Sequence, residues 1–230
     1  MRMNALYSDR RGRPPSPQSV AIEGPAGPLE ALVEDPGGEP PALAVVCHPH
    51  PLHQGTLRNK VAHTLARAAN RAGAPAVRFN FRGVGGSAGT WDEGRGETED
   101  ALAVIAWARR QWPDRPLWLA GFSFGAWIAL RAAPQARPAR LVTVAPPVRR
   151  LPLAETAEPG VPWLVVQGEA DELVDWREVV AWAEALERPP RVERLADTSH
   201  FFHGRLTELQ DVVEDFLRGA PAQDGGANGR

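Results

Sequence analysis

Short apolar runs alternate along the chain with longer segments of helical periodicity. Two runs, at residues 19–22 and 29–33, flank a Gly/Pro-rich turn and predict an opening β-hairpin. Further strands are predicted at residues 43–47, 77–81, 117–122, 140–144, 163–167 and 192–195. The run Leu43–Cys47 is apolar throughout, as expected for a strand buried on both faces of a parallel sheet.

Helices are predicted between these strands, at residues 59–72, 98–112, 123–133, 176–186 and 205–217. Thr98 is the predicted N-cap of the second helix, with Glu99 and Asp100 in its first turn and Arg109 and Arg110 in its last, matching the helix dipole at both ends. Strands that alternate with helices predict an α/β fold, in which helices flank a mostly parallel, doubly wound sheet of about eight strands. We expect one domain over residues 19–218, with disordered tails at 1–18 and 219–230.

In such a sheet, catalytic and ligand-binding residues lie at the carboxyl ends of the strands. The pentapeptide from Gly121 to Gly125, a G-x-S-x-G with Ser123 at its centre, stands where a predicted strand meets a predicted helix. A serine hydroxyl becomes a good nucleophile only when a base removes its proton and a third group orients that base. Asp171 and His200 follow two later strands, so the chain order is Ser, Asp, His, as expected for a serine on such a turn.

Four segments together resemble the α/β-hydrolase fold enzymes, and more narrowly the small, lid-poor bacterial carboxylesterases related to dienelactone hydrolases. They are Cys47-His48-Pro49-His50-Pro51-Leu52, Arg78-Phe79-Asn80-Phe81-Arg82-Gly83-Val84-Gly85-Gly86-Ser87, the G-x-S-x-G pentapeptide, and Ser199-His200-Phe201-Phe202-His203-Gly204. The resemblance covers roughly residues 42–217. It implies an α/β-hydrolase fold with Ser123 as nucleophile, Asp171 as triad acid and His200 as general base. Related dienelactone hydrolases carry cysteine in place of Ser123, a difference that favours ordinary ester cleavage here.

The same reasoning gives two donors for an oxyanion hole. One is the backbone N–H of Phe124, the residue after the nucleophile. The other is expected from the loop after residues 43–47, where the two prolines have no N–H and leave His50 or Leu52. His50 is preferred because the loop resembles the His-Gly-x-Pro loop of the family. Leu52 and Trp91, which lies in a Gly-rich loop, are candidates to line the substrate pocket.

Neighbouring residues compete for two of these roles. Asp175, Glu169 or Glu172 could replace Asp171 as the acid, although each is more simply read as a solvated loop carboxylate. His203 competes with His200, but its simpler role is to cap or pack at the start of the last helix. Cys47 is expected to behave as a small apolar side chain.

Besides esterase activity, the sequence leaves three alternative functions open. His48, His50 and His53 form a tight cluster that could hold zinc in a metal-dependent hydrolase, although no acidic ligand is interleaved. Residues 83–88 fit the G-x-G-x-x-A dinucleotide fingerprint, but a loop follows them where the fingerprint requires a helix. A catalytically silent scaffold of the same fold is the third alternative.

The amino-acid composition limits the kinds of partner that the protein is expected to bind. The 230 residues carry 26 basic and 28 acidic side chains, with no basic stripe of the kind that binds nucleic acid. A single cysteine excludes an intrachain disulfide, and no apolar stretch suits a signal peptide or a membrane span, so a cytoplasmic location is expected. The sequence thus predicts a serine carboxylesterase that needs no cofactor, binds neither nucleic acid nor membrane, and takes small esters into an open pocket without a lid domain. Its oligomeric state is left open.

Overall fold

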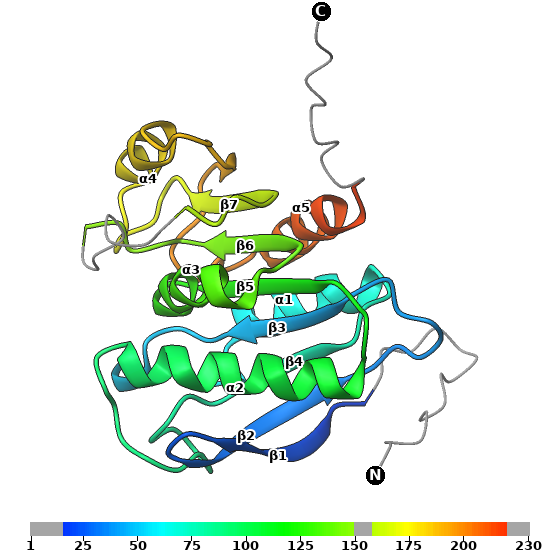
Figure 1. Cartoon of the computed structure of the whole chain (residues 1–230). Coiled ribbons are helices and arrows are strands. Elements are labelled where there is room, and N and C mark those ends of the chain that lie inside the picture. The colour runs from blue at the N-terminus through cyan, green and yellow to red at the C-terminus, as the bar shows by residue number, and fades with distance from the viewer. Residues whose placement is uncertain (1–15, 150–157, 220–230) are drawn as a thin grey trace, which may run out of the picture.

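The strands of the chain form one eight-stranded sheet (Figure 1). The structure is a computed structural model that describes residues 16–149 and 158–219. The strands are β1 (Gln18–Gly24), β2 (Gly27–Glu34), β3 (Leu43–Cys47), β4 (Ala76–Phe79), β5 (Leu117–Phe122), β6 (Arg140–Val144), β7 (Trp163–Gly168) and β8 (Arg191–Leu195). Their order across the sheet is β1-β2-β4-β3-β5-β6-β7-β8. The hairpin β1–β2 pairs antiparallel, β2 also runs antiparallel to β4, and every later pairing is parallel. The predicted α/β architecture is therefore confirmed.

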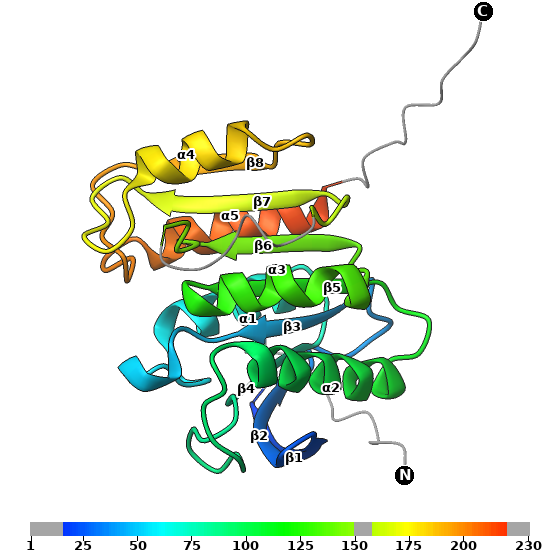
Figure 2. The same ribbon diagram turned by 60° about the vertical axis from the view of Figure 1, so that its left-hand side comes forward.

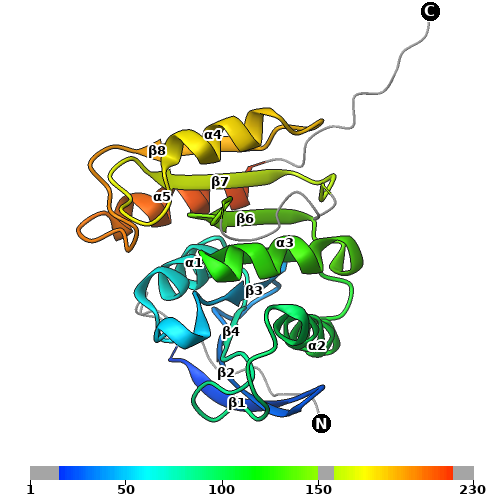
Figure 3. The same ribbon diagram turned by 90° about the vertical axis from the view of Figure 1, so that its left-hand side faces the viewer.

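Within the described ranges, five α-helices cover the two faces of this sheet (Figures 2 and 3). They are α1 (Lys60–Arg71), α2 (Arg95–Gln111), α3 (Phe124–Ala136), α4 (Trp176–Glu184) and α5 (Leu206–Arg218). Helices α1 and α5 pack together on one face, whereas α2, α3 and α4 contribute to the core on the other. Because both faces are covered, the central strands β3, β5, β6 and β7 are buried along their whole length.

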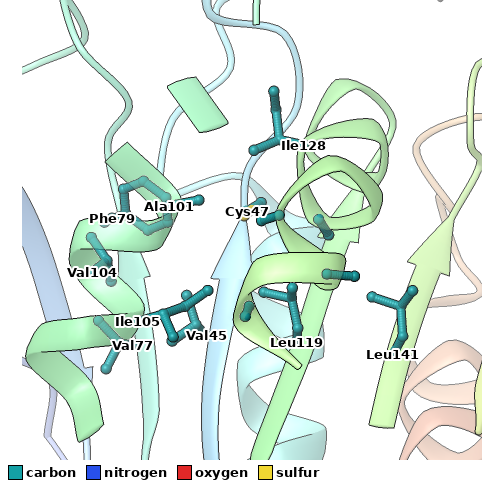
Figure 4. Close-up of a cluster of buried hydrophobic side chains, with 14 of the residues drawn as sticks. Val45, Cys47, Val77, Phe79, Ala101, Val104, Ile105, Leu119, Ile128 and Leu141 are labelled. Carbon is teal, nitrogen blue, oxygen red and sulfur yellow. The ribbon is translucent and has the colours of Figure 1, made fainter. Parts of the chain in front are cut away.

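The larger apolar core lies between the sheet and helices α2 and α3 (Figure 4). Val45 and Leu119, on adjacent strands, belong to one buried cluster with Ile105 of α2 and Ile128 of α3. Full burial of one such aliphatic side chain contributes about 1.5–3 kcal/mol. Cys47 belongs to the same cluster, and burial raises the pKa of its thiol far above the ordinary value, so it packs as an apolar group.

Helix α2 begins earlier than its sequence pattern predicts. Thr98 was the predicted N-cap, but the helix begins at Arg95 and Gly94 is the N-cap residue. The cause is Glu97, whose fully buried carboxylate accepts hydrogen bonds from the amides of Asp92 (2.9 Å) and Gly94 (2.7 Å). Thr98 lies inside the first turn, and its hydroxyl donates to the Gly94 carbonyl. A buried side-chain cap therefore extended the helix by one turn.

The ends of three other elements also differ from the prediction. The strand predicted at 77–81 ends at Phe79, because the amide of Phe81 donates to the His48 ring and leaves the ladder. Helix α3 continues past the predicted end at residue 133 to Ala136, with Pro134 inside its last turn. Helix α4 ends at Glu184, two residues before the prediction.

Some predictions fall partly or wholly outside the described residues. The expected tails lie mostly at 1–15 and 220–230, and β1 already begins at Gln18. The connection between β6 and β7 spans residues 145–162, of which 150–157 are outside the described part. Among the helices of the described residues, none has both the length and the apolar character needed to cross a membrane.

Candidate active site

Ser123 lies on a sharp turn between β5 and α3. Its backbone dihedrals, φ 54° and ψ −117°, lie in a region that non-glycine residues avoid, and its amide donates to the Val144 carbonyl at 2.8 Å. A Cβ on Gly121 would lie 2.1 Å from the Gly125 carbonyl oxygen, and one on Gly125 would lie 2.3 Å from the Cys47 carbonyl oxygen. Both glycines are therefore required for the close contact that holds the serine in this strained conformation.

Three side chains from three strand ends form a continuous chain of contacts. His200 Nε2 lies 3.2 Å from Ser123 Oγ, and His200 Nδ1 lies 2.8 Å from Asp171 Oδ2. The His200 side chain is 3% exposed and that of Asp171 is fully buried. The structure thus brings together the three residues that the sequence analysis placed after β5, β7 and β8.

Asp171 is held as an ionised acceptor. Its Oδ1 accepts the amides of Leu173 and Val174, both at 2.8 Å, and its Oδ2 accepts from Gln167 Nε2 at 2.9 Å as well as from His200. Burial raises the pKa of this carboxyl. The hydrogen bond and charge of His200 and the two backbone amides outweigh burial, so the pKa lies below its ordinary value. A carboxylate in this state orients the imidazole and stabilises its protonated form.

The competing carboxylates have other partners. Asp175 caps α4 by accepting the amide of Arg177 at 2.9 Å, and Glu169 faces Arg194 at 3.5 Å. Glu172 accepts the backbone N–H of His200 at 3.1 Å, so it ties the His200 loop to the Asp171 loop without touching the ring.

His203 is exposed and α5 has Arg205 as its N-cap residue, so His203 does not cap the helix; of the two expected roles only packing remains, with its ring 6.0 Å from that of Phe201. Two phenylalanine rings pack against the imidazole of His200. The rings of Phe122 and Phe201 lie 5.0 Å and 5.1 Å from it, and Phe122 is fully buried. This packing limits the orientations of the His200 ring.

Two backbone amides near Ser123 are available to an anion. Neither Phe124 N nor His50 N donates a hydrogen bond within the described ranges. Of the two candidate amides in the loop after β3, that of Leu52 already donates to His50 Nδ1 at 3.2 Å, which favours the amide of His50. Because Gly125 packs directly on the end of β3, the start of α3 lies beside this loop, and the rings of Phe124 and His50 are 5.0 Å apart.

His48 is fully buried and occupied at both ring nitrogens. Its Nδ1 lies 2.6 Å from the Pro49 carbonyl oxygen, to which it donates, and its Nε2 accepts the amide of Phe81 at 3.1 Å. Burial lowers the pKa of His48 to about 4, consistent with a neutral ring. His50 and His53 stack with ring centroids 4.6 Å apart. Within the ranges that the structure describes, no three metal-binding side chains gather, so these histidines do not form the metal site considered from sequence.

Trp91 forms part of an aromatic wall next to these amides. Its ring stacks on His50 at 4.7 Å and lies 5.1 Å from Phe124. The loop that carries Trp91 is anchored on α2 by Glu97 and by Asp100, whose buried carboxylate pairs with Arg82. Sequence reasoning placed Trp91 correctly in a loop but missed these two buried anchors.

The Gly-rich segment at residues 83–88 belongs to the same loop. The amide of Gly83 donates to the Ala88 carbonyl, and α2 does not begin until Arg95. The amide of Gly86 and the side chain of Asn80 both donate to the Glu30 carboxylate, at 2.8 and 2.7 Å. The segment therefore closes on β2 and does not open a helix as a dinucleotide fingerprint would.

Known proteins share this fold and much of this sequence. A family model described as the alpha/beta hydrolase fold matches residues 52–159. The uncharacterised protein RP471 of Rickettsia prowazekii is 30% identical over 209 residues, which cover 86% of this chain and 87% of that protein. XC6422 of Xanthomonas campestris, described as an α/β serine hydrolase without a lid, is 44% identical over 90% of this chain and 95% of its own, with a TM-score of 0.84. A serine hydrolase homologue from Coxiella burnetii is also 44% identical, over 86% and 95%, with a TM-score of 0.83.

The similarity to these relatives covers 86–90% of the chain, and the residues matched by the family model include the serine turn. The chain belongs to the α/β-hydrolase superfamily. Within that superfamily it is similar to small bacterial α/β serine hydrolases, of which XC6422 is described as lacking a lid.

Proposed function

We propose that this protein is a carboxylesterase that works through an acyl-enzyme on Ser123. The observation that carries the proposal is the unbroken chain of contacts from Ser123 Oγ through His200 to Asp171. In this orientation Nδ1–H of His200 donates to the carboxylate, so Nε2 is free to accept the serine proton.

The reaction then follows from the geometry. Ser123 Oγ attacks the ester carbonyl while its proton passes to His200 Nε2, and the amides of Phe124 and His50 hold the oxyanion. His200 returns the proton to the departing alcohol oxygen as the C–O bond breaks. Water, deprotonated by the same nitrogen, then attacks the acyl carbonyl. The bond to Ser123 Oγ breaks as His200 Nε2 returns the proton to that oxygen, which releases the carboxylic acid and restores Ser123. Asp171 remains ionised throughout.

Apolar side chains at the rim support a preference for small esters. In the described ranges, the exposed large hydrophobic residues are Leu52, Leu173 and Phe201, and each stands one or two residues from a member of the site. Exposed apolar groups gathered at one place generally mark a binding surface. Together with Trp91 they would contact a short acyl chain or a small alcohol group.

The test uses ester hydrolysis and covalent labelling together. The wild-type protein is expected to hydrolyse 4-nitrophenyl acetate and butyrate faster than long-chain triglycerides. A small fluorophosphonate should add to Ser123, detected by intact mass and peptide mapping. The Ser123→Ala variant is expected to lose the label and nearly all turnover while its Tm changes little, because the serine hydroxyl contributes little packing. Labelling at another residue, or a preference for triglycerides, would contradict the proposal.

A further inference from the structure

A buried amide stands where the alternation of β7 calls for an apolar residue. Trp163, Val165 and Gln167 occupy alternate positions of the strand, and the first two belong to the apolar core on the α2–α3 face. Gln167 is fully buried. A buried amide without partners costs about 1–3 kcal/mol, so its presence in this strand requires a compensating interaction.

The Gln167 side chain finds that interaction on the triad acid. Its Nε2 lies 2.9 Å from Asp171 Oδ2 and 3.2 Å from the carbonyl oxygens of Gly168 and Val174. Its Oε1 has no partner among the described residues. Three acceptors therefore surround the NH₂ group, and the reversed amide would face all three with an oxygen, so the orientation of the side chain is determined.

The two oxygens of Asp171 are held in different ways. Oδ1 accepts two backbone amides, which hold it against the loop that follows β7. Oδ2 is the oxygen that receives His200 Nδ1, and no backbone amide of the described chain donates to it. Gln167 is the second donor to Oδ2, and it comes from the rigid strand and not from the loop.

We propose that Gln167 is the positioning residue of the triad, which holds Asp171 Oδ2 in line with His200 Nδ1. It touches neither substrate nor the reacting atoms and acts through Asp171. The inference rests on the proposed function of the same three side chains. Misplacing a catalytic group by about 1 Å can cost roughly a hundredfold in rate, which sets the scale of the expected effect.

The test compares three variants by their fluorophosphonate labelling kinetics. Gln167→Met keeps the length of the side chain and removes the donor. Gln167→Glu can donate from the same place only while its carboxyl is neutral. Thr143→Val is the matched control: Thr143 is also fully buried, on neighbouring β6, and its hydroxyl accepts from Trp163 Nε1 at 2.9 Å without contacting the triad. All three variants lose or alter buried hydrogen bonding: the Gln167 variants change the donor that faces three acceptors, and Thr143→Val removes the acceptor of one bond.

We expect Gln167→Met to lower the maximal labelling rate about ten- to a hundredfold with little change in half-saturating probe concentration. Thr143→Val should label at the wild-type rate even if its Tm falls as far as that of Gln167→Met. At low pH, Gln167→Glu should label faster than Gln167→Met. The proposal is overturned if Gln167→Met labels as fast as Thr143→Val, or if Gln167→Glu is no faster than Gln167→Met at any pH.

Labelling also separates this inference from the proposed function. If wild type labels at Ser123 but hydrolyses none of the esters, carboxylesterase activity is refuted, and the comparison of the variants still decides the role of Gln167. If wild type does not label at all, Ser123 is not activated and both proposals fail.

Discussion

The neutral ring of His48 makes a specific prediction about stability in acid. In the folded protein Nδ1 donates to Pro49 and Nε2 accepts from Phe81, so a proton added at Nε2 would meet the Phe81 N–H. In the unfolded chain the same ring takes up a proton near its ordinary pKa of 6.5, whereas folding lowers the pKa to about 4. Between these two pKa values the unfolded state binds more protons than the folded state. The contribution of the neutral His48 ring to the free energy of unfolding is therefore present above pH 6.5 and is lost as the pH falls toward 4.

The size of the effect follows from this difference in pKa. Lowering the pKa of His48 from 6.5 to about 4 corresponds to about 3 kcal/mol, at about 1.4 kcal/mol for each pKa unit. Of this, about 2 kcal/mol is lost between about pH 7 and about pH 4.5. A domain of ordinary stability has about 5–15 kcal/mol in total, so the contribution is large enough to measure.

The variant His48→Asn isolates this contribution from that of other titrating groups. Its amide can donate to the Pro49 carbonyl as Nδ1 does, but it cannot reach the Phe81 amide and it does not titrate. At pH 7 we expect it to be less stable than wild type by about 1–3 kcal/mol, because the Phe81 N–H is left buried and unpaired. At about pH 4.5 this gap should shrink by about 2 kcal/mol, since only wild type loses the contribution of the neutral ring.

Urea unfolding followed by tryptophan fluorescence measures the gap at both pH values. Other carboxylates and histidines titrate in both proteins, and their contributions cancel in the difference. An equal gap at the two pH values would refute the reasoning, because His48 would then carry no penalty for protonation. A changed slope of the unfolding free energy with urea would show that the variant alters the native or unfolded state more widely.

Two further substitutions test how the loops of the site are held. Asp100→Ala leaves the Arg82 guanidinium without its buried partner and should lower the free energy of unfolding by about 3–5 kcal/mol. Urea unfolding measures this, and a loss below about 1 kcal/mol, typical of a surface pair, would contradict it. Gly125→Ala places a Cβ 2.3 Å from the Cys47 carbonyl oxygen and so should push α3 away from the end of β3. Fluorophosphonate labelling of Ser123 should slow by roughly a hundredfold as the Phe124 amide moves, and an unchanged labelling rate would show that the contact is not needed.

Elements formed by continuous apolar runs were predictable from the sequence. The bounds of β3 and β5 agree with the predicted apolar runs, because these strands are buried on both faces and their sequences have no polar interruption. The bounds of β6 also agree with the prediction, although Arg140 and Thr143 interrupt its apolar run. The places of Ser123, Asp171 and His200 could be predicted for a related reason. In a parallel sheet, residues that follow different strands arrive at one edge, however far apart they are in the chain.

The side chains that hold this edge together could not be predicted in the same way. Glu97 and Gln167 look like ordinary polar residues in a helix start and a strand end, and only the folded chain shows that each is fully buried against a loop. Their partners lie one to seven residues away, separations at which many side-chain contacts are possible and none is favoured by periodicity. The error at the start of α2 has this origin.

The buried polar side chains around the site share one physical task. The loops after β3, β4 and β7 are too short to form a core of their own, so they depend on a few buried or partly buried hydrogen-bonding side chains that reach them from a strand or a helix. His48 joins the loop after β3 to the end of β4, Asp100 holds the loop that carries Trp91, and Gln167 donates to Asp171 in the loop after β7. An apolar residue at these positions would fill the same space without fixing a direction, whereas a hydrogen bond fixes both distance and angle. A change at one of these anchors should therefore displace the loop it holds, and alter labelling of Ser123, at denaturant concentrations where the sheet is still folded.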